Sequence, residues 1–347
     1  MSLLIDGIIF SLQRHGGISV YFRELLMRLK RDAVPTLLTL DGALKQEPLQ
    51  GNDTLTVLAR PGRMLERGRH CLSPPAGPGT VFHSSYYRLP SLRALPTVVT
   101  VHDFAYERTV KGPRRWLHSA QKLAAIREAQ AVVCISRATR ADLQELVGER
   151  PGQQITVIQN GVSDAFHPLA STPAQRPFIL FVGERSGYKN FGLALKALHF
   201  LPDVTLRCVG GGPLQSSDLA GASSATRQRV AHEGFISDAQ LNELYNQALC
   251  LVYPSRYEGF GIPVAEAMRA GCPVVAIDCR AVLEVGGDAL IVSDDEPRQL
   301  AAAIERVAVG AYRADVVARG KNVAARYSWE ANYQAMREVY RALSNGG

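Results

Sequence analysis

Residues 253–276 read YPSRYEGFGIPVAEAMRAGCPVVA. An apolar strand-like run ends at Tyr253, and a loop with two glycines follows it. A helix is expected next, with Pro263 in its first position and Gly271 just past its end, because each residue suits that end of a helix. The stretch therefore predicts a strand, a loop and a helix, with free backbone amides at 260–262, where anionic or hydroxyl oxygens bind well.

Two acidic residues flank this loop. Glu258 precedes it, and Glu266 falls in the expected first turn of the helix. Open α/β sheets bind ligands at the carboxyl ends of their strands, so both carboxylates are expected to face one cleft there. Taken alone, the pair also fits a simpler interpretation, in which Glu266 complements the helix dipole and Glu258 is a surface acid.

Strand-like and helix-like patterns alternate along the whole chain, which predicts parallel α/β sheets. The first strand is expected over residues 3–10, followed by a helix from about Gly17. Ser136 is expected to cap a helix over 137–146, and Ser237 to open a capping box. Further strands are expected at 97–101, 131–135, 155–158, 178–182, 204–209, 250–252 and 274–277.

A length of 347 residues favours two domains. A polar, proline-rich linker is expected at 166–177, between a first domain, 1–165, and a second domain, 178–326. The segment 327–347 is predicted to be an amphipathic helix that packs back on the first domain. Its expected docking residues are Trp329, Tyr333, Met336, Val339 and Tyr340.

Composition is that of an ordinary soluble protein, with 46% hydrophobic and 20% charged residues. The first residues lack the basic start of a signal peptide, so a cytoplasmic protein is expected. Six cysteines stand singly, without metal-ligand spacing, which favours buried reduced thiols over disulfides or zinc.

The positive charge of the chain is concentrated in residues 1–165, which carry 21 Lys and Arg against 14 Asp and Glu. These basic residues either form a solvated face or attract anionic lipid headgroups or a diphosphate-bearing acceptor. Nucleic acid is a poorer candidate, because no aromatic residues interleave with them. The two clusters are Arg60, Arg63, Arg67 and Arg69, then Arg108, Lys111, Arg114 and Arg115.

Residues 253–276 resemble the Glu-x7-Glu motif of retaining glycosyltransferases with the GT-B fold, specifically family 4. The resemblance implies two Rossmann-like domains facing across a cleft. Residues 1–165 would form the acceptor side, and residues 178–326 would bind the nucleotide sugar. It implies that Glu258 lies beside the donor sugar hydroxyls and that Glu266 hydrogen-bonds the ribose hydroxyls. The amides after Glu258, at Phe260, Gly261 and Ile262, would contact the sugar and phosphates.

Upstream, residues 183–190 read GERSGYKN and place Arg185 and Lys189 after a strand. Such a pair could be ordinary surface charge. However, a departing nucleoside diphosphate needs fixed positive charge, and the sequence has no metal motif to supply it. The family has an arginine and a lysine at this position, so the resemblance gives both residues that role.

The first domain offers further matches to the family. Gly16 and Gly17 form a glycine turn whose amides would cradle the diphosphate, although a plain structural turn also fits. His102, at the end of a buried strand, aligns with a histidine that approaches the donor sugar; a core histidine is the alternative. Asp103 would orient that ring or contact the acceptor.

The acceptor side is expected at Tyr86, Tyr87 and Arg88, which could instead simply pack over the surface. On the donor side, Gly211 in a triple-glycine loop would let the backbone approach the donor, or form only a turn. Phe235 and Ile236 match family positions that contact the nucleobase.

These residues predict a metal-independent, retaining hexosyltransferase that needs no cofactor beyond its donor. The resemblance is strongest to mannosyltransferases of bacterial O-antigen or exopolysaccharide assembly, and it therefore favours GDP-mannose or a related GDP-deoxyhexose as the donor. UDP- and dTDP-sugars are left open by an atypical loop at 278–284. The acceptor is expected to be a glycan or a lipid-diphosphate-linked oligosaccharide. It would be used at the cytoplasmic face of the inner membrane, in cell-surface polysaccharide synthesis such as that of O-antigen, with peripheral contact to anionic lipid.

Other functions fit less well. A nucleotide-sugar epimerase would share the fold but release free sugar. A sugar phosphorylase needs a pyridoxal-phosphate lysine site that is not recognisable in the sequence. A non-catalytic nucleotide- or glycan-binding subunit would not need all four of Arg185, Lys189, Glu258 and Glu266. A dehydrogenase is disfavoured because no strand is followed by Gly-x-Gly-x-x-Gly and a later acid.

Overall fold

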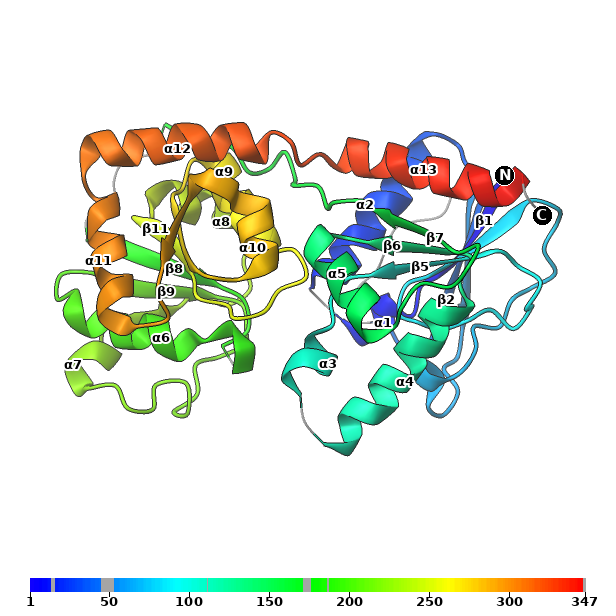
Figure 1. Ribbon diagram of the computed structural model, residues 1–347, viewed down its shortest axis with the longest axis horizontal. Coiled ribbons are helices and arrows are strands. Elements are labelled where there is room, and N and C mark those ends of the chain that lie inside the picture. Colours follow the sequence, from blue (N-terminus) through cyan, green and yellow to red (C-terminus); the bar gives the residue numbers. More distant parts are fainter. Residues whose placement is uncertain (14–15, 45–52, 111, 171–175, 186, 346–347) are drawn as a thin grey trace. The chain divides into compact units, whose positions relative to one another are not determined.

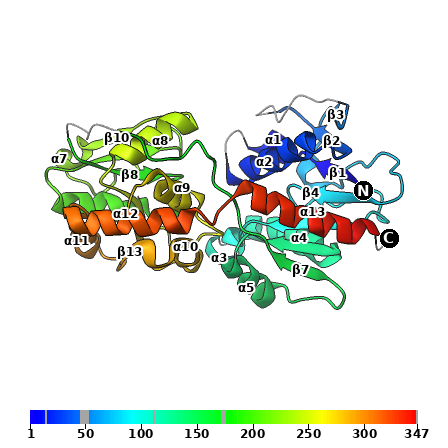
Figure 2. The ribbon, with the colours of Figure 1, turned by 90° about the horizontal axis from the view of Figure 1, so that it is seen from above.

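The computed structural model describes residues 1–13, 16–44, 53–110, 112–170, 176–185 and 187–345. The chain forms two compact units (Figures 1 and 2). Unit 1 comprises Met1–Gly161 and Trp329–Gly347, and unit 2 comprises Val162–Ser328. The predicted linker at 166–177 lies partly outside the described residues, and its described residues belong to unit 2.

Unit 1 is built on a seven-stranded sheet in the order β3-β2-β1-β4-β5-β6-β7, and every pairing is parallel. Chain order reverses direction between β1 and β4, which are neighbours in the sheet. Open α/β sheets bind ligands at such a switch point. The strands are β1 Ser2–Asp6, β2 Thr36–Asp41, β3 Leu55–Arg60, β4 Thr80–Ser84, β5 Thr97–Val101, β6 Ala131–Cys134 and β7 Gln154–Val157.

Helices cover the sheet of unit 1, and the C-terminal helix α13 packs against α2 and β4 (Figure 1). All five of the expected docking residues of α13 are buried in the core of this unit. The helices are α1 Ile9–Leu12, α2 Gly17–Arg31, η1 Glu66–Gly68, α3 Ala105–Thr109, α4 Pro113–Glu128, α5 Arg137–Leu146 and α13 Trp329–Asn345.

Unit 2 has a six-stranded parallel sheet in the order β10-β9-β8-β11-β12-β13. Its switch point lies between β8 and β11. The strands are β8 Phe178–Val182, β9 Thr205–Val209, β10 Val230–His232, β11 Cys250–Tyr253, β12 Val274–Ile277 and β13 Leu290–Ser293. This doubly wound architecture in both units confirms the predicted fold of two Rossmann-like domains.

The helices of unit 2 lie on both faces of its sheet, and α12 packs against α9 (Figure 2). They are η2 Gly187–Lys189, α6 Phe191–Ala197, η3 Leu198–Phe200, α7 Ser224–Arg227, α8 Asp238–Gln247, α9 Ile262–Ala270, α10 Arg280–Gly286, η4 Gly287–Ala289, α11 Pro297–Val307 and α12 Gly310–Ala324. Ser237 caps α8 with the complete capping box that the sequence predicts.

The first predicted strand, residues 3–10, is wrong in its second half. β1 ends at Asp6, and Ile9–Leu12 form the short helix α1. The Asp6 carboxylate accepts a hydrogen bond from the Ile8 amide at 3.0 Å and turns the chain. Apolar residues lie on both sides of Asp6 and Gly7, and short apolar runs of this kind do not distinguish a buried strand from a buried helix.

Candidate active site

The quoted stretch 253–276 folds into β11, a loop and α9. Gly261 precedes the helix with a φ of +94°, and Gly271 ends it with a φ of +83°, both in the left-handed region that favours glycine. Pro263 is the second helical residue, because the helix begins at Ile262. Glu266 is the fifth, so it lies just past the first turn rather than within it, and its side chain projects toward α8.

Lys189 and Glu258 meet at the switch point of unit 2. Lys189 follows β8 and Glu258 follows β11, and these two strands are neighbours in the sheet. The Lys189 ammonium donates to Glu258 Oε1 at 2.6 Å. Their side chains are 16% and 9% exposed, so the ion pair is largely withdrawn from solvent. The structure therefore brings together two predicted residues that are 69 positions apart in the sequence.

Tyr253 is the third member of this group. From the sequence it was expected only to end a strand. The Lys189 ammonium lies 5.6 Å from the centre of the Tyr253 ring. Burial alone would lower the pKa of Lys189, but the Glu258 carboxylate beside it raises that pKa above its ordinary value. Burial also raises the pKa of Tyr253 far above its usual range, so its hydroxyl stays neutral. At neutral pH the site thus holds a fixed ammonium charge.

Glu266 is held by Tyr245, whose hydroxyl donates to Glu266 Oε2 at 3.2 Å. Burial raises the pKa of the Glu266 carboxyl to about 8; the Tyr245 hydrogen bond lowers it and the carboxylate of Asp238 raises it further. The carboxyl therefore carries a proton over much of the neutral range when no ligand is bound. Ribose hydroxyls near it would find a group able both to donate and to accept a hydrogen bond.

Glu266→Gln is expected to flatten the dependence of stability on pH. The folded protein holds the Glu266 proton more tightly than the unfolded chain, so the free energy of unfolding falls as pH rises from about 5 to 8. This single group contributes up to about 1.4 kcal/mol per pH unit. Urea unfolding at pH 5, 6.5 and 8 measures the slope, with Glu243→Gln, an exposed position on α8, as control. Parallel curves for wild type and Glu266→Gln would contradict the assignment.

The Arg185 guanidinium was expected to face a ligand, but in the structure it is bound by other groups of the protein. Its side chain is 2% exposed, and Nε donates to Asp218 Oδ2 at 3.0 Å. Nη1 and Nη2 donate to the carbonyls of residues 210–213 at 2.7–3.0 Å. Nη1 and Nη2 thus hold the glycine loop that follows β9 while Nε pairs with Asp218, and a diphosphate would have to displace some of these carbonyls.

Gly211, in that loop, lies against Arg185. Its φ is +71°, and an added Cβ would come within 2.9 Å of Arg185 Nη1 and 3.1 Å of the Gly183 carbonyl. Packing of the loop on Arg185 thus requires glycine at this position. That requirement explains Gly211 whether or not a donor approaches the loop.

The two residues that are predicted to contact the nucleobase follow β10, at the carboxyl end of that strand. Phe235 is 69% exposed and Ile236 is half-buried. Phe260, expected near the sugar, instead buries its ring against Tyr327, with the ring centres 5.4 Å apart. Its side chain therefore supports the loop, while its backbone precedes α9.

In unit 1, His102 directly follows β5 and is buried against the Tyr21 ring, with the ring centres 5.2 Å apart. Burial lowers the pKa of His102 to about 4; the Asp103 carboxylate raises it and Lys122 lowers it. The imidazole is therefore neutral at pH 7. Among the residues that the structure describes, its buried Nε2 has no hydrogen-bond partner.

Other predicted residues of unit 1 lie at turns. Gly16 precedes α2 in an extended conformation, and Gly17 begins the helix. The first turn of α2, which is described in full, carries no acidic side chain to neutralise the positive end of the helix dipole. Asp103 accepts a hydrogen bond from the Ala105 amide at 2.8 Å and shapes the turn into α3.

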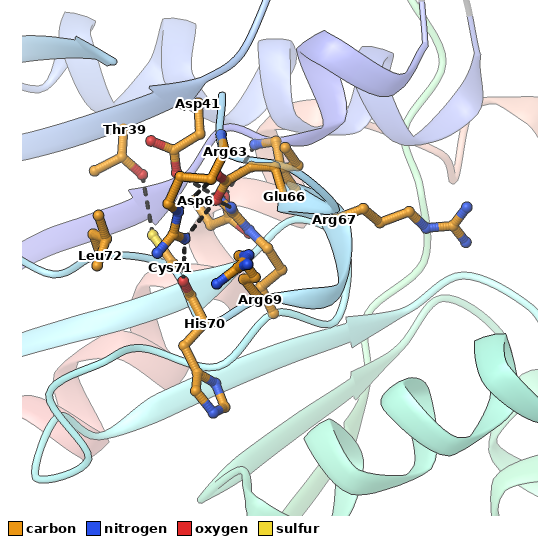
Figure 3. A network of polar contacts seen from close by, with 12 residues as sticks. Asp6, Thr39, Asp41, Arg63, Glu66, Arg67, Arg69, His70, Cys71 and Leu72 are labelled. Atoms are coloured by element: carbon orange, nitrogen blue, oxygen red, sulfur yellow. Dashed lines mark hydrogen bonds and ion pairs between the residues drawn. The ribbon is translucent and has the colours of Figure 1, made fainter. Parts of the chain in front are cut away.

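Arg88 does not have the acceptor-binding position that was expected for it. Its side chain is fully buried and pairs with three carboxylates. These belong to Asp6, Asp41 and Glu66, which lie close together in Figure 3. Arg88 donates to Asp6 through two nitrogens, to Asp41 Oδ2 at 2.9 Å and to Glu66 Oε1 at 2.7 Å. Arg88 is therefore the centre of a structural ion network rather than a surface contact for a substrate.

The tyrosines beside Arg88 differ from each other. Tyr87 is buried with a φ of +58°, which is unusual for a residue with a side chain. Tyr86 is half-buried and accepts a hydrogen bond from Arg67 at 3.2 Å, so it is the more accessible of the two.

All six cysteines are buried and unpaired, as predicted. Among the described residues, no three His, Cys, Asp or Glu side chains gather into a group that could hold a metal ion. No helix in the described part of the chain is long and apolar enough to span a membrane.

Two family models match the chain. A model described as glycosyl transferases group 1 matches residues 176–309, and a model of glycosyltransferase family 4 matches residues 15–166. Each match falls almost entirely within one of the two units. With the two doubly wound sheets, these matches define the chain as a glycosyltransferase of the family 4 type with the GT-B fold.

Similar curated proteins include O-antigen chain mannosyltransferase B of Escherichia coli, 27% identical over 72% of this chain and 71% of that protein. Alpha-maltose-1-phosphate synthase of Mycolicibacterium smegmatis is also 27% identical, over 95% of this chain and 96% of that protein. Among solved structures, sucrose-phosphate synthase from Thermosynechococcus elongatus has a TM-score of 0.78 at 19% identity, covering 100% of both chains. A glycosyltransferase from Rickettsia africae has a TM-score of 0.71 at 15% identity, covering 99% of this chain and 98% of the other.

Proposed function

We propose that the chain is a retaining, metal-independent hexosyltransferase whose donor binds at the switch point of unit 2. The observation that carries this proposal is the Lys189–Glu258 pair, 2.6 Å apart, at the carboxyl ends of neighbouring strands. Beside it lies the N-terminus of α9, which no side chain caps and which favours phosphate oxygens. Glu266, on the same helix, takes the ribose hydroxyls.

The chemistry needs charge where the nucleoside diphosphate leaves. As the bond from the anomeric carbon to the phosphate oxygen breaks, the Lys189 ammonium stabilises the negative charge on that oxygen. Glu258 orients both the sugar hydroxyls and Lys189. The acceptor hydroxyl attacks from the face that the phosphate leaves, and its proton passes to the departing phosphate. Arg185 adds a second positive charge once it releases carbonyls of the 210–213 loop.

The favoured donor is GDP-mannose or a related GDP-deoxyhexose. The likeness to an O-antigen mannosyltransferase supports this choice. Other relatives are named for different sugars, such as alpha-D-kanosaminyltransferase of Streptomyces kanamyceticus, at 25% identity. The preferred nucleotide is therefore the first property to measure.

The proposed acceptor is a glycan or a lipid-diphosphate-linked oligosaccharide, used in cell-surface polysaccharide synthesis at the cytoplasmic face of the inner membrane. Two features of unit 1 support it. Residues 1–165 carry seven more basic than acidic side chains, and Tyr86 remains accessible beside the switch point of this sheet. A positively charged surface favours both anionic lipids and a diphosphate.

A panel of GDP, UDP, dTDP and ADP tests the donor site by thermal shift. A nucleotide present at 100 times its Kd adds about 2.7 kcal/mol to stability, which should raise Tm by about 5 °C or more. GDP is expected to give the largest rise. A larger rise with UDP or dTDP would reassign the donor, and no rise with any of the four would overturn the donor site.

A further inference from the structure

The loop at residues 61–70 exposes two neighbouring large apolar side chains. Met64 is 79% exposed and Leu65 is 78% exposed, more than any other large hydrophobic side chain in the described ranges. They stand together at the tip of the loop that leaves β3. Single exposed apolar residues are common on protein surfaces, but an adjacent pair displayed this fully is a candidate contact site.

The tip has a defined conformation. Leu65 has a φ of +58°, in the left-handed region that side chains usually avoid, and it opens the short helix η1. Glu66 holds this turn: its carboxylate accepts from the Arg63 amide at 2.8 Å and from the Arg63 guanidinium at 2.7–2.8 Å. The same carboxylate accepts from the buried Arg88 at 2.7 Å. The ion network around Glu66 (Figure 3) thus holds the turn that exposes the two apolar side chains.

The charge around the tip is positive. Glu66 is the sole acidic residue in the sequence between Asp53 and Asp103, and its carboxylate is paired with Arg63 and Arg88. Arg67 lies over the Tyr86 ring, 4.8 Å from its centre, and Arg69 donates to the Met64 carbonyl. Among the residues described, no ion pair joins either arginine to a carboxylate, and both contact uncharged groups, the Tyr86 ring and hydroxyl and the Met64 carbonyl.

We propose that loop 61–70 docks unit 1 onto an anionic bilayer surface. Met64 and Leu65 enter the boundary between headgroups and acyl chains, while Arg67 and Arg69 meet the lipid phosphates. Apolar side chains flanked by basic ones are the combination that interfacial binding requires. This inference rests on the proposed function, which places the protein at a membrane, and it identifies the loop that makes the contact.

Vesicle co-sedimentation tests the loop with the full chain. Wild type is expected to bind vesicles containing phosphatidylglycerol and to bind pure phosphatidylcholine at least tenfold more weakly. Met64→Ser with Leu65→Asn should lower binding at least tenfold; asparagine tolerates the left-handed conformation, so the turn is preserved. Arg67→Gln with Arg69→Gln should lower it about fivefold per arginine at low salt. Leu92→Ser, another exposed position of unit 1, should bind as wild type.

Two results would overturn the inference: equal vesicle binding by wild type and the Met64/Leu65 variant, or concentration-dependent self-association that disappears in that variant. The thermal shift with nucleotide distinguishes a failure of the loop proposal from a failure of the donor-site proposal. It should be unchanged in the Met64/Leu65 variant, because the donor site lies in unit 2. Failed vesicle binding with an intact nucleotide response would reject the loop alone, and loss of the nucleotide response in wild type would reject the donor site alone.

Discussion

Lys189→Ala is expected to lower kcat/KM for sugar transfer by about 10²–10³-fold. The substitution removes the fixed ammonium beside Glu258, and deletion of one preorganised group that stabilises transition-state charge typically costs that factor. The loss should fall mainly on kcat, because the negative charge on the leaving diphosphate develops as the bond breaks. Initial rates of nucleotide release with donor and acceptor present measure the effect.

Lys196→Ala is the matched control for this experiment. Lys196 is an exposed lysine on α6 of the same unit, so the substitution makes the same change in net charge away from the switch point. It should leave kcat/KM within about twofold of wild type. Turnover of Lys189→Ala at the level of Lys196→Ala would remove Lys189 from the mechanism.

Arg88→Met should destabilise unit 1 by about 3–5 kcal/mol, because it leaves the buried carboxylates of Asp6 and Asp41 without their main partner. Methionine keeps much of the side-chain volume, so the loss reports the broken ion pairs rather than a cavity. Urea unfolding followed by circular dichroism measures the change in the free energy of unfolding.

Arg93→Met removes an arginine from the same unit at an exposed pair. Arg93 and its partner Glu128 are about half exposed, and pairs of this kind contribute about 0–1 kcal/mol. The contrast between Arg88→Met and Arg93→Met isolates the effect of burial. Similar losses in the two variants would contradict the structural role of the Arg88 network.

The sequence predicted four of the six strands of unit 2, because fully buried parallel strands appear as short continuous apolar runs bounded by turns. The edge strands β10 and β13 were not expected. β8, β11 and β12 fall within a residue of their expected bounds. β1 and α1 show the limit of this signal, since the apolar residues on either side of Asp6 and Gly7 suit a strand or a helix equally. The Asp-Gly pair is a turn signal in the sequence, and there the Ile8 amide donates to the Asp6 carboxylate.

The candidate site was predictable where its residues are close in sequence. Glu258, the loop glycines and Glu266 belong to one strand–loop–helix segment with recognisable ends. The pairing of Lys189 with Glu258 depends on β8 and β11 being neighbours, which the sheet order decides. The engagement of Arg185 by the 210–213 carbonyls and of Arg88 by three acids depends on side-chain rotamers and tertiary packing. Neither has a signature in local sequence.

The central claim is that Lys189 and Glu266 hold the nucleotide of the donor in unit 2. Isothermal titration of the preferred nucleoside diphosphate into wild type, Lys189→Ala, Glu266→Ala and Lys196→Ala tests it most directly. We expect wild type and Lys196→Ala to bind alike, and each of the other two variants to bind at least tenfold more weakly while remaining folded. Equal affinity in all four proteins would contradict the claim.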